Sequence, residues 1–185
     1  MNKYIAAVAL AAATSFSSMH VAASEPGQVD FGRFTPSPGA EFVEVNVTSN
    51  LIAMVTNLAK KQEPQIAEIL GGLKSIRVNV LGLNDANRED ITKRIETIRT
   101  KLDESGWERL VTVLKEKEDV GIFMKTRGPD VVEGVVVTVL QGDKQAVFIN
   151  VIGDIHPEKL ATVGERFNIE PLKNLPGKPV AVISK

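Results

Sequence analysis

The chain of 185 residues has no cysteine, a single tryptophan and only two histidines. Without cysteine there can be no disulfide, no thiolate nucleophile, no thiolate metal site and no lipid-modified cysteine of a bacterial lipoprotein. His20 falls within the first two dozen residues, so His156 is the one histidine in the remainder. A zinc site needs three or four protein ligands, and we therefore expect neither a bound metal nor another cofactor. The fold must be held together by its core.

Long hydrophobic runs are also missing. The only candidate is at the N-terminus, MNKYIAAVALAAATSFSSMHVAAS, and its apolar part is much shorter than the ~20 residues of a membrane-spanning helix. Lys3, the apolar stretch and the small residues before Ser24 predict a signal peptide over residues 1–23. We therefore expect an exported protein, periplasmic or extracellular, with no transmembrane segment after cleavage.

The chain has no excess of charge of either sign. It carries 22 basic and 23 acidic residues, and removal of Lys3 with the signal peptide leaves a balance of −2. Nucleic-acid binding needs a basic field to attract phosphate groups. The composition therefore argues against nucleic acid as a partner.

Residues 24–40 are rich in proline, glycine and serine and are predicted to form an extended arm. Phe31 and Phe34 interrupt its polarity. Two interpretations follow: the aromatic rings tether the arm to the domain, or they belong to a docking peptide that binds a partner. Loss of thermal stability on deletion of residues 24–39 is expected only from the first.

Residues 41–170 are predicted to form one α+β domain, with a mixed sheet and about three helices packed on one face. Alternating valines indicate a strand at 41–48, and Leu51, Val55 and Leu58 are spaced as the apolar stripe of the next helix. Ile91, Ile95, Ile98 and Leu102 mark a longer helix. From Trp107 onward, four apolar runs with short polar breaks predict an antiparallel meander. Residues 171–185 are predicted to form a tail with a candidate edge strand, Val180–Ile183.

Asp154, His156 and Glu158 are the weak candidates for a catalytic cluster. Pro157 favours the first position of a helix, so that Gly153 and Asp154 would turn the chain out of a strand and Glu158 would lie in the first helical turn. Leu160, Val163, Gly164 and Phe167 would then form the buried stripe of that helix. Each polar residue has a structural task in this interpretation. No G-x-S-x-G elbow and no glycine-rich phosphate loop accompanies them.

Four segments, taken in order, resemble a known family. They are VEVNVTSNLIAMV, IAEILGGLKSIRVNV, EDVGIFMKTRGPDVVEGVVVTV and AVFINVIGDIHPEKLATVGERFNI. Together they resemble the exported bacterial proteins grouped as domain of unknown function 4252, over roughly residues 30–172. The resemblance implies a small secreted or envelope α+β domain, and it carries no catalytic or ligand-binding residue to this chain.

Two functions remain open from the sequence. The first is a non-enzymatic envelope module that binds another protein or itself, through the arm (Phe31, Phe34) or the tail. The second is a carboxylate-dependent hydrolase of a cell-wall or small extracellular substrate, with its two acids drawn from Asp130, Asp143, Asp154 and Glu158. We favour the binding module, because those acids stand where turns and helix starts attract acidic residues anyway.

Overall fold

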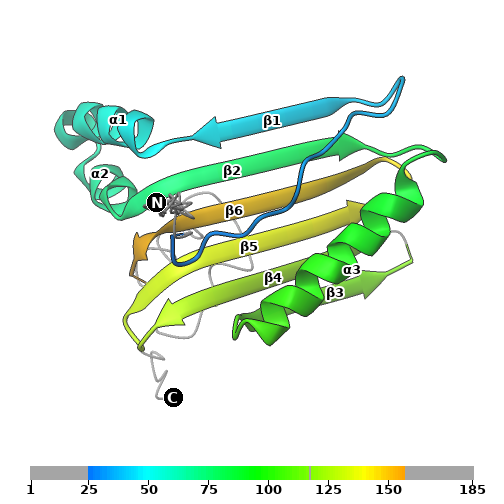
Figure 1. Ribbon diagram of the computed structural model, residues 1–185. Helices are drawn as coiled ribbons and strands as arrows, with labels where there is room; N and C mark the ends of the chain where they lie inside the picture. The colour runs from blue at the N-terminus through cyan, green and yellow to red at the C-terminus, as the bar shows by residue number, and fades with distance from the viewer. Residues whose placement is uncertain (1–24, 117, 157–185) are drawn as a thin grey trace, which may run out of the picture.

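The computed structural model describes residues 25–116 and 118–156. Within these ranges the chain forms one six-stranded sheet and three helices (Figure 1). In chain order the elements are β1 (Phe42–Val47), α1 (Ser49–Gln62), α2 (Pro64–Gly71), β2 (Leu73–Gly82), α3 (Arg88–Glu104), β3 (Glu108–Lys115), β4 (Glu118–Arg127), β5 (Val131–Gln141) and β6 (Gln145–Ile155). The signal segment, the helix expected after Pro157 and the tail strand Val180–Ile183 lie outside the described residues.

The strands are ordered β1-β2-β6-β5-β4-β3, and every described pair is antiparallel. The α+β class and the meander of the last four strands are confirmed. The sheet has no parallel pair among the described strands, whereas the sequence had suggested a mixed one. The reason is that the α1–α2 hairpin returns the chain to the end where β1 stops, so that β2 runs back beside β1.

α3 lies across one face of the sheet, which we call the helix face (Figure 1). Its predicted stripe of Ile91, Ile95, Ile98 and Leu102 is buried, as expected. The stripe belongs to the main core cluster together with Phe123, Val136 and Phe148 of the sheet. Burying each of these isoleucines stabilises the fold by roughly 1.5–3 kcal/mol relative to leaving it exposed.

A polar contact fixes α3 against the strands beneath it. Arg99 donates from Nη1 to both carboxylate oxygens of Asp119 on β4, at 2.7 and 2.9 Å, and from Nε to Thr138 Oγ1 on β5 at 3.0 Å. The Arg99 side chain is largely buried, and its Nη2 has no hydrogen-bond partner. Because desolvation offsets much of the attraction in such a pair, its main effect is to fix the position of the helix.

The arm lies on the helix face beside α3 (Figure 1). Asn150 on β6 holds it: its Oδ1 accepts from the Val29 amide at 3.0 Å and its Nδ2 donates to the Gly27 carbonyl at 2.9 Å. The arm crosses β5 at Gly134, where an added Cβ would lie only 2.6 Å from the Gly27 Cα. The arm therefore approaches the backbone of the sheet at a point where no side chain intervenes.

α1 and α2 form a hairpin beyond the ends of β1 and β2 (Figure 1). Pro64 occupies the start of α2, as the sequence predicts, because its fixed φ suits the first helical turn. In the described part of the chain, no helix is long and apolar enough to cross a bilayer.

Candidate interaction surfaces

The aromatic rings of the arm point into the domain. Phe31 is only 3% exposed and belongs to the main core cluster, and Phe34 is partly buried beside it. Their ring centroids lie 5.6 and 4.8 Å from that of Phe148. Arg94 of α3 covers Phe34, with its Cζ 4.8 Å from the ring centroid. This is the arrangement expected of a tethered arm, and it leaves little of Phe31 for a partner to contact.

Asp154 belongs to an exposed ion cluster. Its Oδ1 accepts from Arg127 Nη2 at 2.7 Å, and its Oδ2 lies 3.5 Å from Lys74 Nζ. Arg127 also donates from Nε to Glu133 at 2.9 Å. The carboxylate therefore joins β2, β4 and β6 at one end of the sheet. His156, two positions later in the chain, is exposed, and Glu158 lies outside the described residues.

The turn expected at Gly153 and Asp154 was wrong, since β6 continues to Ile155. The Asp154 amide donates to the Gly72 carbonyl at 2.8 Å, which extends the pairing of β6 toward the start of β2. A Cβ on Gly153 would collide with the backbone of Gly72. Glycine at this position thus allows two backbone segments to approach closely, and it does not mark a reversal of the chain.

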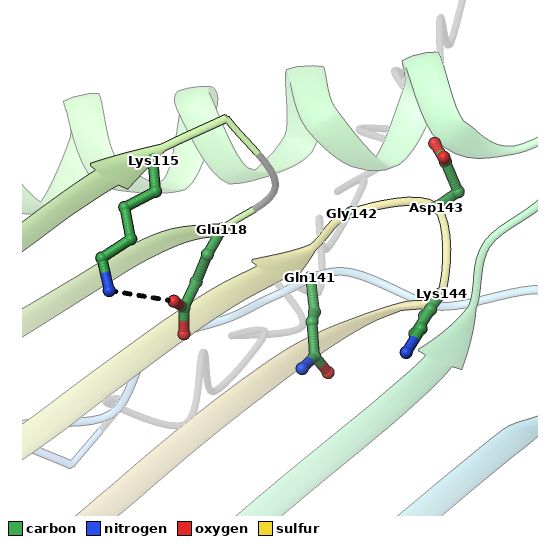
Figure 2. Close-up of a pocket in the computed structure, with 6 residues that line it drawn as sticks. All are labelled: Lys115, Glu118, Gln141, Gly142, Asp143 and Lys144. Atoms are coloured by element: carbon green, nitrogen blue, oxygen red, sulfur yellow. Dashed lines mark ion pairs between the residues drawn. The ribbon is translucent and has the colours of Figure 1, made fainter.

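The remaining acids of the hydrolase hypothesis lie in the connections between strands. Asp130 is exposed in the β4–β5 turn, and Asp143 forms an ion pair with Arg88 from the β5–β6 turn. Asp143 also lines a shallow depression of about 410 Å³ with Lys115, Glu118, Gln141, Gly142 and Lys144. Figure 2 shows that the carboxylates of Glu118 and Asp143 point to opposite sides of this depression. The two groups do not face a common substrate position.

Among the described residues, no group of three or more histidine, aspartate or glutamate side chains is placed to share a metal ion. The acidic stretch from Asp85 to Glu96 forms a turn and the first turns of α3. The Asn84 amide donates to Asn87 Oδ1 at 2.9 Å, and Asn87 Nδ2 donates to the Gly82 carbonyl at 2.9 Å. These bonds account for the polar residues before the helix.

Large apolar side chains are exposed on α1. Leu51 is 41% exposed, Met54 56%, Val55 42% and Leu58 69%. Their spacing of three and four residues places them on one side of the helix, and we call this set the α1 stripe. Leu51, Val55 and Leu58 were expected to be buried. The structure buries Ile52 and Thr56 of α1 instead, so the apolar surface of this helix is wider than its contact with the rest of the domain.

β1, the strand at one edge of the sheet, adds further exposed apolar side chains. It is an edge strand, paired only with β2 among the described strands. Val43 and Val45 are 41% and 43% exposed. Of the seven large hydrophobic residues that are exposed in the described part of the chain, six belong to β1 and α1; the seventh, Leu114, lies on β3 at the opposite edge.

The face of the sheet away from α3 is also apolar. The register aligns three rows of side chains across all six strands on this face. They are Val113-Val120-Val139-Val147-Val80-Val43, then Val111-Ile122-Val137-Ile149-Val78-Val45, then Glu108-Met124-Val135-Val151-Ile76-Val47. We call this surface the valine face. Only Glu108 among its eighteen positions is polar.

The sequence contained a signal for the α1 stripe that periodicity alone does not reveal. Apolar residues occur at seven of the eleven positions from Ser49 to Ala59, which is more than one buried side of a helix requires. The alternating valines of β1 were likewise expected to be half buried. Their exposure follows from the position of β1 at the edge of the sheet.

Comparison with known families gives one result for this chain. The model of the family described as Domain of unknown function (DUF4252) matches residues 39–163. No curated protein and no solved structure matches the chain significantly. The matched range covers the sheet and the three described helices and leaves out most of the arm. Because it spans more than half of the sequence, the chain belongs to the DUF4252 family.

Proposed function

We propose that this protein is an exported, non-catalytic module that binds another protein through the α1 stripe. The observation that carries the proposal is the concentration of six of the seven exposed large hydrophobic residues on β1 and α1. An apolar surface that gathers on neighbouring elements is typical of a docking site, whereas scattered apolar residues are normal on any protein surface. Export is proposed from the signal-peptide pattern of residues 1–23.

The composition of α1 favours a protein partner over a lipid surface. Helices that lie in a membrane interface carry basic residues along their polar side and anchor with tryptophan, phenylalanine or leucine. α1 has no aromatic residue, and its two lysines, Lys60 and Lys61, are confined to the last turn. Leucine, methionine and valine at helical spacing instead match the contacts that one amphipathic helix offers another in a groove.

The neighbouring strand offers a second mode of contact. β1 has one unpaired edge among the described strands, so that its outward amide and carbonyl groups are available to an extended segment of a partner. A partner that contributes an apolar helix to the α1 stripe and a strand to β1 would use both surfaces. Backbone pairing would then supply affinity, and the α1 side chains would supply specificity.

The test is site-specific photocrosslinking in the cells that produce the protein. A photoreactive phenylalanine analogue replaces Leu58 on α1 or Leu114 on β3. The two leucines are matched in exposure, at 69% and 73%; Leu58 lies on α1, which follows the edge strand β1, and Leu114 lies on β3 at the opposite edge of the sheet. We expect a defined protein adduct from position 58 and none from position 114. An adduct of equal yield at both positions, or at neither, would contradict the proposal.

A second measurement separates a protein partner from a lipid surface. Leu51→Lys and Met54→Lys introduce charge into the α1 stripe of the chain that carries the photoreactive analogue at position 58, and Leu114→Lys in the same chain is the control. We expect the α1 variants to lose the crosslinked adduct while the control keeps it. Sedimentation with anionic phospholipid vesicles is expected to be weak for all three. Strong vesicle binding that only the α1 variants lose would assign the stripe to a lipid surface instead.

A further inference from the structure

The two edges of the described sheet, β1 and β3, differ in their protection against pairing with another strand (Figure 1). Natural edge strands are protected by charged side chains, prolines or β-bulges. β3 carries Glu108, Arg109 and Lys115. Its register with β4 also shifts between Arg109 and Val111. β1 carries Glu44 as its one charged residue, and its register with β2 is regular throughout. β1 is therefore the less protected edge.

The backbone of β1 directs alternate residues toward β2 and away from the sheet. The Gly82 amide donates to the Glu41 carbonyl at 2.7 Å, so these two residues form a hydrogen-bonded pair of the antiparallel ladder. Because such pairs alternate along a strand, the odd-numbered residues of β1 bond to β2 and the even-numbered residues direct their amide and carbonyl groups outward. The outward residues are Phe42, Glu44 and Asn46.

The side chains of β1 are accessible on both faces of the sheet. The four central residues of the strand, from Val43 to Asn46, are all exposed. Val43 and Val45 lie on the valine face, and Glu44 and Asn46 lie on the helix face. A strand added at this edge would therefore meet valines on one face and polar side chains on the other.

We propose that β1 pairs antiparallel with β1 of a second copy of this chain, with Val45 facing Val45 across a two-fold axis. On the valine face, this register places Val43 opposite Val47 of the second copy. On the helix face, it places Glu44 opposite Asn46 of the second copy. The contact is isologous, because each strand offers the other the same residues. The proposal rests on the proposed function in treating β1 as an interaction edge, and it names the partner of that edge.

The side chains of β1 favour this register over its neighbours. Outward residues can bond only to outward residues, so the second copy can shift only by two positions at a time. One such shift brings Glu44 opposite Glu44, and like charges directly opposite on neighbouring strands are destabilising. The other shift brings Asn46 opposite Asn46 and shortens the overlap of the two strands. The register centred on Val45 avoids both costs.

The helix face also provides complementary groups for this register. Asn46 Nδ2 donates to Glu44 Oε1 of its own strand at 2.9 Å, and the amide nitrogen has a second hydrogen for the Glu44 carboxylate of the second copy. Arg77 on β2 donates from Nε to Asn46 Oδ1 at 3.3 Å. The guanidinium therefore adds positive charge to the row of the sheet that receives the carboxylate of the second copy.

The size of the contact predicts a weak dimer. β1 has six residues, so two such strands bury little surface, and small interfaces are typical of transient association. We therefore expect a monomer with an open β1 edge in dilute protein and a dimer as the concentration rises. Another protein that contributes a strand to β1 would have to displace the second copy.

The first test uses the absence of cysteine, because one substitution then gives one thiol per copy. Val45→Cys places two thiols opposite each other at a non-hydrogen-bonded pair, where the Cα atoms are about 4.5 Å apart. A disulfide can span this distance. Val43→Cys is the matched control, since Val43 is 41% exposed and Val45 43%. The two copies of position 43 are separated by four residues along the strands, or about 13 Å.

The purified variants are equilibrated in a glutathione redox buffer, and the disulfide-linked dimer is quantified. We expect the yield from Val45→Cys to exceed that from Val43→Cys by about tenfold or more, because pairing raises the effective concentration of the facing thiols. A mixture of Val43→Cys with Val47→Cys is expected to link the two variants. Equal yields from Val45→Cys and Val43→Cys would indicate random collision and overturn the proposal. Preferential linkage of position 43 to position 45 would reveal the shifted register and overturn it as well.

The second test removes one outward backbone donor. Glu44→Pro deletes an amide that does not bond to β2, and proline is tolerated on an edge strand where its nitrogen faces solvent. Glu44→Gln is the matched control, because it removes the charge and keeps the amide. Sedimentation velocity over a range of protein concentrations measures association, and chemical denaturation confirms that each variant is folded. We expect Glu44→Gln to dimerise and Glu44→Pro to stay monomeric. A folded Glu44→Pro that still dimerises would contradict the proposal, as would an original chain that is monomeric at every concentration.

These experiments are separate from the test of the proposed function. They use the purified protein alone, whereas the adduct at position 58 is formed with another protein in the producing cells. Absence of the dimer would overturn the pairing of β1 with a second copy and leave the α1 stripe as a binding site. Absence of the adduct in a chain that dimerises would overturn the α1 proposal alone.

Discussion

At the scale of single residues, Asn150 is the clearest example of a polar side chain with a structural task. It is 2% exposed, and its amide bridges the arm to the sheet through Gly27, Val29 and Val135. A buried amide in the middle of a sheet is costly unless its hydrogen bonds are satisfied. Here the backbone of the arm satisfies them. The arm therefore stabilises buried Asn150, and Asn150 holds the arm on the sheet.

Asn150→Leu is therefore expected to destabilise the fold. The substitution leaves the Val29 amide and the Gly27 carbonyl without their partners, at a cost of about 2–4 kcal/mol in the free energy of unfolding. Chemical denaturation monitored through Trp107 measures the change. Asn46→Leu is the matched control, because Asn46 occupies the same row of the sheet but is exposed on β1. A similar loss in both variants would show that the arm contacts are not responsible.

At the scale of elements, the arm behaves as part of the core rather than as an appendage. Phe31 packs in the main cluster, and Phe34 contacts both the tilted ring of Phe148 and the guanidinium of Arg94. Deleting residues 24–39 removes both rings and exposes Phe148 and Asn150. The loss of one buried phenylalanine alone costs about 3–5 kcal/mol.

We therefore expect the deletion to lower the midpoint of thermal unfolding markedly. Scanning calorimetry of the deleted and complete chains measures it, with Phe31→Ala as a milder variant and Leu114→Ala as an exposed control. An unchanged midpoint, accompanied by loss of the adduct at position 58, would show that the arm docks a partner and does not stabilise the domain.

At the scale of the whole molecule, one described strand pair, β2 with β6, joins segments that are distant in the chain, whereas the other four pairs join consecutive strands. The pairing of β2 with β6 joins residues that are far apart in the chain, since Ile76 pairs with Val151, 75 positions later. Contacts of such separation slow folding, because the loop between them must close first. We therefore expect the β2–β6 pair to form later than the β5–β6 hairpin, and β2, β6 and β5 are each flanked on both sides in the finished sheet.

Amide hydrogen exchange should reflect this order. We expect the slowest exchange in β6 and β5, and faster exchange in β1 and β3, since an edge strand can open without disturbing the core. Mass spectrometry of peptides after deuteration gives the protection of each strand. Protection of β1 equal to that of β6 would mean that the β1 edge is paired in the isolated protein.

Most individual elements could be predicted from the residues alone. The isoleucines of α3, the alternating valines of the strands and the short breaks of the meander depend on periodicity, which is a local property. The arm was also identified by composition. In contrast, the exposure of Leu51, Val55 and Leu58 could not be predicted, because apolar spacing shows that residues share a side of a helix but not what lies against that side. The extension of β6 through Gly153 and Asp154 depended on contact with Gly72, which is distant in sequence.

The sequence by itself determined the α+β class, the identity of most helices and strands, and the lack of any cysteine-based chemistry, because these follow from side-chain type and local spacing. Only the tertiary structure decided that β2 lies beside β6, that the arm is bound to Asn150, and that three rows composed mainly of valine and isoleucine align on one face. Such features arise from pairings between distant segments, and their register depends on the packing of the whole sheet.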